Sequence, residues 1–194
     1  MKPQNCTNYI FLLVLLSTLV SCKQLSESTA SNDAVLNGSF ETIEAGYPVN
    51  WNIYSSKTVP EGRFEVLLDS TDPQDGNVCL KFEVDSCSDK GGRFSPGLFS
   101  EVETKTGHTY KVSYYIQNAG CKYRVKTGMI TNKNSQIKTF IRQPGRDHEW
   151  VRHEHLIKIE QGFDRLRFEL NVLSPGSLRL DNISIEEVDK QSAG

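Results

Sequence analysis

Apolar and polar residues alternate with a period of two along most of the chain from Val35 onward. The clearest runs cover residues 63–68, 78–84, 110–117, 123–126, 166–172 and 178–185. Successive side chains of a β-strand point to opposite faces, so each run predicts a strand with one buried face. Turn-forming pairs such as Asn37-Gly38, Pro96-Gly97 and Pro144-Gly145 lie between runs.

Helical signals are weak in the same region. No window of about a dozen residues repeats apolar positions every 3.6 residues between capping residues. About nine or ten short strands without crossover helices indicate antiparallel sheets. We therefore predict an all-β domain over residues 35–188: a two-sheet antiparallel β-sandwich of the jelly-roll type.

The alternation also predicts which side chains face outward. In the run 110–117, Tyr114 and Ile116 occupy the core side, and Tyr115 and Gln117 occupy the other side. The same argument turns four further polar side chains outward, and we expect all six to share the outer face of one sheet. The four are Arg124, Arg167, Glu169 and Asn171.

The N-terminus has the pattern of a targeting segment. Residues 10–20 form an apolar run that is too short to span a bilayer, which takes about 20 residues. The run ends in Leu19-Val20-Ser21-Cys22, which resembles a bacterial lipobox. Residues 1–21 are thus interpreted as a lipoprotein signal peptide, with Cys22 lipidated to anchor the protein in a membrane, expected to be the outer membrane. An ordinary secretory signal with an incidental cysteine is the alternative.

Two polar segments flank the predicted domain. Residues 22–34 are rich in serine, asparagine and acidic residues and predict a flexible tether, and residues 189–194 predict a disordered tail. Overall, 22 basic residues stand against 24 acidic ones, for a net charge of −2. Because a phosphate backbone requires a basic face, nucleic acid is not an expected partner.

Four segments, in this order, resemble the galactose-binding-like jelly roll of carbohydrate-binding modules found beside xylanases and glucanases. They are residues 36–41 with Pro48 and Trp51, then 76–82, 109–116 and 178–185. The resemblance implies a non-catalytic carbohydrate-binding protein. It also implies a structural calcium ion held by Glu41 and Asp181, with a backbone carbonyl from the turn around Asn77, and oxygen donors of this kind suit calcium.

A sugar site combines an aromatic ring with planar polar groups that bond hydroxyls. On the predicted outer face, Tyr115 is the stacking candidate. The hydrogen-bonding candidates are Gln117, Arg124, Arg167, Glu169 and Asn171. The arginines and Glu169 can equally bridge one another as a solvated ion pair. In the resembled family, tryptophans at the places of Trp51 and Trp150 pack in the core.

Other chemistry has less support. His153 and His155 point to one side of a strand and could share a zinc ion, but a third ligand at a fixed spacing is missing. Acidic residues are plentiful, yet no pair is singled out for a glycoside hydrolase. Cys87 and Cys121 each follow a strand end and are the predicted disulfide pair, leaving Cys79 unpaired.

Two interpretations of function remain open. The first is a lipid-anchored protein that captures poly- or oligosaccharide at the bacterial envelope. The second is a structural or assembly lipoprotein whose jelly roll binds another protein.

Overall fold

The computed structural model describes residues 36–59, 61–147 and 149–188. The predicted signal peptide (1–21), the lipidation of Cys22, the tether (22–34) and the C-terminal tail (189–194) lie outside the described residues. Within the described ranges, no helix is both long enough and apolar enough to cross a membrane.

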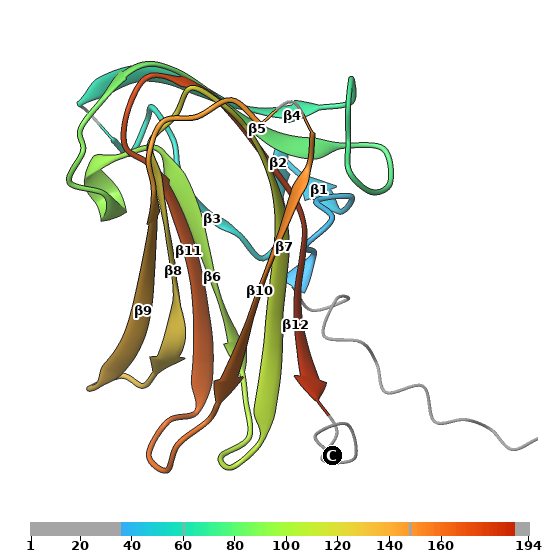
Figure 1. Ribbon diagram of the computed structural model, residues 1–194, viewed down its shortest axis with the longest axis vertical. Helices are drawn as coiled ribbons and strands as arrows, with labels where there is room; N and C mark the ends of the chain where they lie inside the picture. Colours follow the sequence, from blue (N-terminus) through green and yellow to red (C-terminus); the bar gives the residue numbers. More distant parts are fainter. Residues whose placement is uncertain (1–35, 60, 148, 189–194) are drawn as a thin grey trace, which may run out of the picture.

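Two five-stranded antiparallel sheets face each other (Figure 1). One sheet has the order β10 (Val151–Lys158), β7 (Thr109–Ala119), β12 (Gly176–Val188), β5 (Cys79–Cys87) and β4 (Gly62–Asp69). The other has the order β3 (Asn52–Tyr54), β6 (Gly97–Glu103), β11 (Arg165–Val172), β8 (Tyr123–Ile130) and β9 (Ser135–Arg142). A small hairpin joins β1 (Ile43–Glu44) to β2 (Tyr47–Pro48), and Gly92–Phe94 form a single 3-10 turn, η1. The predicted all-β sandwich is confirmed.

The core lies between the two sheets, and the period-two pattern determines which side chains enter it. Leu166, Phe168, Leu170 and Val172 of β11 are completely buried. Tyr114 of β7 packs edge-on against Phe168, with ring centroids 5.1 Å apart. Burying a large apolar side chain contributes roughly 1.5–3 kcal/mol, so alternation along ten strands supplies the main driving force for folding.

The residues before β3 close one end of the core. Asn37 adopts a left-handed conformation with φ 54°, and its side-chain amide bonds to backbone groups of Thr42 and Val49. The Trp51 indole donates to the carbonyl oxygen of Asn37 at 3.0 Å and packs against the ring of Phe40. The prediction that Trp51 belongs to the core is confirmed, whereas Trp150 is only half-buried.

The regular pairing of strand β12 is interrupted where the first described residues of the chain contact it. The register with β7 shifts between Asp181 and Ser184, and Asn182 takes a positive φ of 46°. At this irregularity the Ile183 amide donates to the carbonyl oxygen of Gly38 at 3.0 Å. The first described residues therefore attach to β12 beyond the point where β5 stops pairing with it at Leu180.

Candidate functional site

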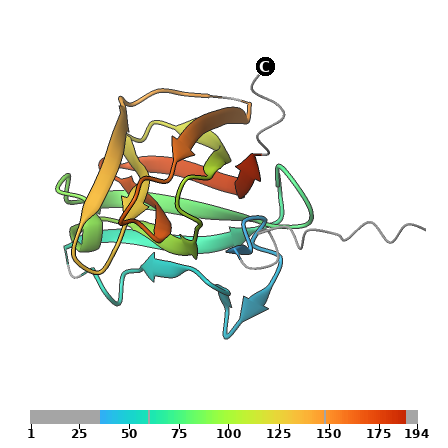
Figure 2. The same cartoon turned by 90° about the horizontal axis from the view of Figure 1, so that it is seen from below.

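The six residues predicted to share one face are divided between the two sheets. Tyr115 and Gln117 lie on β7, whereas Arg124 lies on β8 and the other three lie on β11. β7 belongs to one sheet and β8 and β11 belong to the other (Figure 2), so alternation along each strand turns the two groups to opposite outer faces of the sandwich. The single six-residue face is thus wrong, although the outward orientation within each strand agrees with the prediction.

We call the outer surface of the β3-β6-β11-β8-β9 sheet the aromatic face. The strand registers arrange its side chains in rows that run across the strands. One row reads Tyr54, Gly97, Asn171, Arg124, Ile141; the next reads Asn52, Phe99, Glu169, Lys126, Thr139; and the third reads Glu101, Arg167, Gly128, Ile137. Four of the predicted residues therefore lie together with Tyr54 and Phe99, whose pairing the sequence did not predict.

Tyr54 and Phe99 form the aromatic pair of this face. Their ring centroids are 5.6 Å apart with an interplanar angle of 36°, and both residues are half-buried. The guanidinium carbon of Arg167 lies 3.9 Å from the centroid of the Phe99 ring, a cation–π contact. Burial and the negative charge of Glu169 raise the pKa of Tyr54, so its hydroxyl remains protonated and able to donate.

Arg167 is the centre of the polar groups on this face. It donates to Glu169 at 3.1 Å and to Glu101 at 2.9 Å, and Arg165 donates to the second oxygen of Glu101 at 2.6 Å. Glu169 is only 4% exposed, so its charge depends on Arg167 for compensation. These contacts hold the planar groups in fixed orientations, which is what hydroxyl recognition requires.

The loop between β5 and β6, residues 88–96, covers one end of the aromatic face. Asn171 is fully buried, accepts from the Gly92 amide at 2.9 Å and returns a bond to the Gly92 carbonyl. Arg124 donates to the side-chain oxygen of Asn171 at 2.9 Å and to the carbonyl of Lys90 at 3.3 Å. Gly91 has φ 74° and lies so close to the Arg124 guanidinium that a Cβ there would clash with it. Asn171 is therefore a positioning residue for this loop.

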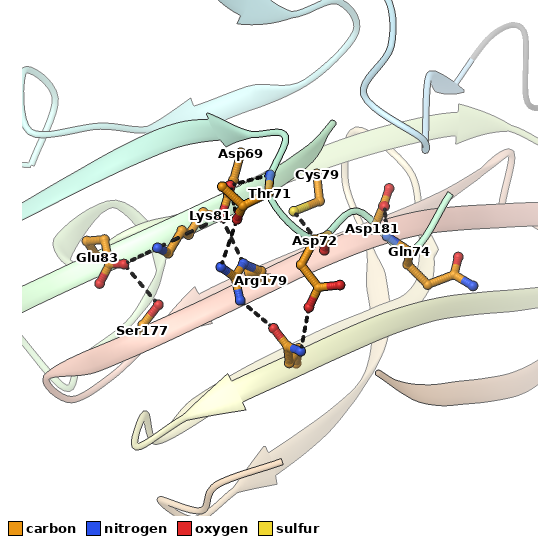
Figure 3. A network of polar contacts seen from close by, with 11 residues as sticks. Asp69, Thr71, Asp72, Gln74, Cys79, Lys81, Glu83, Ser177, Arg179 and Asp181 are labelled. Carbon is orange, nitrogen blue, oxygen red and sulfur yellow. Dashed lines mark hydrogen bonds and ion pairs between the residues drawn. The ribbon is translucent and has the colours of Figure 1, made fainter. Parts of the chain in front are cut away.

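We call the outer surface of the β10-β7-β12-β5-β4 sheet the network face. Its centre is a chain of paired charges around Arg179 (Figure 3). Arg179 donates to Asp69 at 2.9 Å and to Gln117 at 2.5 Å, and Gln117 in turn donates to Asp72 at 3.0 Å. Burial opposes ionisation of Asp69, but hydrogen bonds from Thr71 and Arg179 lower its pKa to about 2. Gln117 is thus engaged within the protein.

The residues predicted to hold calcium lie against the loop between β4 and β5. Burial raises the pKa of Asp181 to about 6, although its carboxylate accepts backbone N–H bonds from Gln74, Asp75 and Asn182. Glu41 accepts from the backbone of Asn77 and Val78 and from the Asn77 side chain.

The fit of these groups to calcium is partial. Two carboxylates from opposite ends of the chain approach one loop, and a cation would compensate the buried charge of Asp181. However, the hydrogen-bond partners of both carboxylates named above are N–H donors. Within the described ranges, no group of three or more histidine, cysteine, aspartate or glutamate residues is placed to hold a metal ion. The structural calcium stays a prediction.

The two histidines considered for zinc point into the sandwich, at the seam between the edge strands β9 and β10. His155 stacks on Phe140 with centroids 4.1 Å apart, and its Nε2 lies 3.2 Å from the Tyr114 hydroxyl. His153 stacks on Tyr114 at 5.1 Å. Burial and nearby cationic side chains lower the pKa of both histidines. Aromatic packing explains these residues without a metal.

The predicted Cys87–Cys121 disulfide is not formed, because Cys79, Cys87 and Cys121 are all free. Strand β12 lies between β5, which ends at Cys87, and β7, which precedes Cys121. β12 begins to pair with β5 only at Gly176, opposite Val84, so Cys87 lies beyond its first residue. The two thiols are still close enough for Cys87 to contribute, after burial, to raising the pKa of Cys121 to about 12.

Comparison with known proteins identifies the fold. No protein-family model matches the sequence, and no curated protein matches it. Among solved structures, the chain is similar to a CBM4 module, with TM-score 0.56, 10% identity, and coverage of 78% of this chain and 98% of that one. The CBM22-1 xylan-binding domain from Paenibacillus barcinonensis gives TM-score 0.50 and 15% identity, covering 78% and 92%.

A third similar structure is the enzymatically active domain of tailspike protein 4 from bacteriophage CBA120. It has TM-score 0.59 and 14% identity, and the match covers 78% of this chain but only 20% of the tailspike chain. At identities this low, the similarities establish architecture. The chain has the jelly-roll β-sandwich fold of carbohydrate-binding modules.

Proposed function

We propose that this protein binds poly- or oligosaccharide, without transforming it, on the aromatic face. The observation that carries the proposal is the Tyr54–Phe99 pair, which lies beside a row of fixed planar polar groups. The binding modules to which the chain is similar in fold include domains described as xylan-binding. A family 22 module from Clostridium thermocellum, with TM-score 0.51, is described as binding its ligand in a cleft.

The arrangement suits a sugar chain laid across the strands. An aromatic ring packs against the C–H face of a pyranose, where apolar surface is removed from water. Guanidinium, carboxylate and amide groups then bond pairs of hydroxyls, which fixes the orientation of the ring. The rows provide both kinds of contact in sequence, from Tyr54 on β3 to Lys126 on β8.

Binding without catalysis is the function that these groups support. Hydrolysis of a glycosidic bond requires one carboxyl group that holds a proton and gives it to the leaving oxygen. The two carboxylates at the centre of the face, Glu101 and Glu169, both accept bonds from Arg167. Both carboxylates are therefore arranged as hydrogen-bond acceptors, not as groups that deliver a proton.

The proposal extends to location. Residues 1–22 support a lipid-anchored protein of the bacterial envelope, tethered so that the domain meets glycans near the membrane. Anchoring has a direct test: metabolic labelling with a palmitate analogue should mark the protein and fail to mark Cys22→Ser.

Affinity electrophoresis in gels containing xylan, mixed-linkage glucan or mannan tests glycan binding. We expect at least one polymer to retard the protein, and Tyr54→Ala to weaken that retardation about tenfold, equivalent to about 1.4 kcal/mol. Tyr115→Ala is the matched control, since it removes the same ring from the network face. Retardation lost in Tyr115→Ala and kept in Tyr54→Ala would move the site to the other sheet. Failure to bind across a broad glycan screen favours the protein-binding alternative.

A further inference from the structure

The charges on the aromatic face are paired at one end and unpaired at the other. Arg165 and Arg167 both contact Glu101, and Arg167 also contacts Glu169. Glu103 and Asp164 add two further carboxylates near Arg165, where the surface is hollowed into a pocket of about 410 Å³. Both arginines at this end therefore have carboxylate partners.

The opposite end presents cations without such partners. Arg124 and Lys126 lie two residues apart on β8, about 6–7 Å along the strand, on the same face. Among the described residues, neither takes part in an ion pair. Glu169 faces Lys126 from β11, but its carboxylate is bound to Arg167, and β9 places the neutral Thr139 opposite Lys126.

The adjoining loop adds to this positive region. Lys90 and Arg93 lie within it, and their charged groups are 5.7 Å and 5.2 Å from the exposed Phe94 ring. The hydrogen bonds of Arg124 go to neutral oxygens, and its buried Nε has no hydrogen-bond partner within the part of the chain that the structure describes. Asp89 is the one carboxylate in this loop.

We infer, resting on the proposed function, that the glycan carries uronate carboxylates and that Arg124 and Lys126 recognise them. A guanidinium and an ammonium on neighbouring positions match one carboxylate in charge and geometry. A neutral sugar would use the same donors but gain nothing from their net charge. The acidic end of the face orients such a chain, because it repels the carboxylates along the strands toward Arg124 and Lys126.

The test compares glucuronoxylan with the same polymer after chemical reduction of its carboxyl groups, using the full-length protein in affinity electrophoresis. We expect roughly fivefold tighter binding of the acidic polymer at about 20 mM salt, and loss of this preference at about 300 mM. Lys126→Gln should reduce the preference, because it should weaken binding of the acidic polymer several-fold more than binding of the reduced polymer. Arg124→Lys, which keeps the charge but loses the planar fork, should retain part of it.

Lys133→Gln is the matched control, since it removes one exposed lysine from the turn beyond the other end of the face. It should keep the full preference. Equal binding of both polymers by the wild-type protein overturns the uronate inference and leaves carbohydrate binding intact. No binding of either polymer overturns the uronate inference, and a failure across the broad glycan screen overturns carbohydrate binding as well. Undiminished binding of the acidic polymer by Tyr54→Ala indicates general charge adsorption and also overturns the inference.

Discussion

The two outer faces of this sandwich use similar residue types in different ways. On the network face, Arg179, Asp69, Gln117 and Asp72 satisfy one another, and a loop covers Asp181. On the aromatic face, Arg167 is also paired, but it stacks on one ring of an aromatic pair and borders unpaired cations. A polar surface whose groups are fully paired stabilises the fold, whereas one that combines fixed polar groups with accessible rings can accept a ligand.

The largest expected effect comes from removing the central guanidinium of each face. Arg167→Ala leaves the nearly buried Glu169 without its partner and should lower the free energy of unfolding by about 3 kcal/mol. Arg179→Ala should lower it by only about 1–2 kcal/mol, because Lys81 remains 3.8 Å from Asp69. Urea denaturation measures both. Glycan binding should be lost in Arg167→Ala alone, and its loss in Arg179→Ala as well would remove the distinction between the faces.

The pH dependence of stability tests the covered carboxylate of the network face. The pKa of Asp181 is raised to about 6, so the folded state binds the proton more tightly than the unfolded chain does. The contribution of protonated Asp181 to the free energy of unfolding is fully present below pH 3.8 and is lost as the pH rises to about 6.

In Asp181→Asn, the free energy of unfolding should therefore fall less steeply between about pH 4.5 and 6.5. The amide bonds the loop less well than the carboxyl group does, so this variant should also be less stable overall by about 1–2 kcal/mol. Asp72→Asn, an exposed residue of the same loop, is the control and should keep the wild-type slope. An identical slope in Asp181→Asn would show that Asp181 titrates normally.

A smaller effect is expected from calcium. If Glu41 and Asp181 bind the ion, saturating Ca²⁺ should raise the melting temperature by several degrees and EDTA should reverse the change, because a ligand of the native state stabilises it. Glu41→Gln should abolish the response. A melting temperature that is the same in EDTA and in calcium would dismiss the site.

The smallest effect is expected from Tyr115. It is a partly exposed ring on the network face, so Tyr115→Ala should change the unfolding free energy by about 0.5 kcal/mol or less and leave glycan retardation unchanged. Thermal denaturation and affinity electrophoresis provide the two measurements. A large loss of affinity here would transfer the binding function to the network face.

The sequence predicted the sandwich because the alternation of apolar and polar residues is a local signal of strands with one buried face. It also predicted correctly that Arg167, Glu169 and Asn171 point away from the core. Alternation carries no information on which strands are neighbours, however, so Tyr115 was grouped with residues of the other sheet. The Cys87–Cys121 pairing rested on the two strand ends alone, which do not say how the loops that follow them are placed relative to each other.

The aromatic pair was missed for a related reason. Tyr54 lies on a strand of three residues, which is too short to show a period. Phe99 does alternate with the buried Leu98 and Val102, so an outward aromatic on residues 97–103 was the available signal. Only the pairing of β3 with β6, a contact between distant parts of the sequence, brings the two rings together.

Strand β12 gives the domain a particular mechanical character. Val188 is its last residue, and Gly38 is bonded to its Ile183, so both ends of the described chain connect to one strand. Residues 178–180 of β12 are paired on both sides, by β7 and by β5, so a pull along the strand loads two rows of hydrogen bonds there in shear. An edge strand would instead be peeled away one bond at a time. For the glycan-binding function that we propose, this strand would be the part of the domain best able to hold under tension.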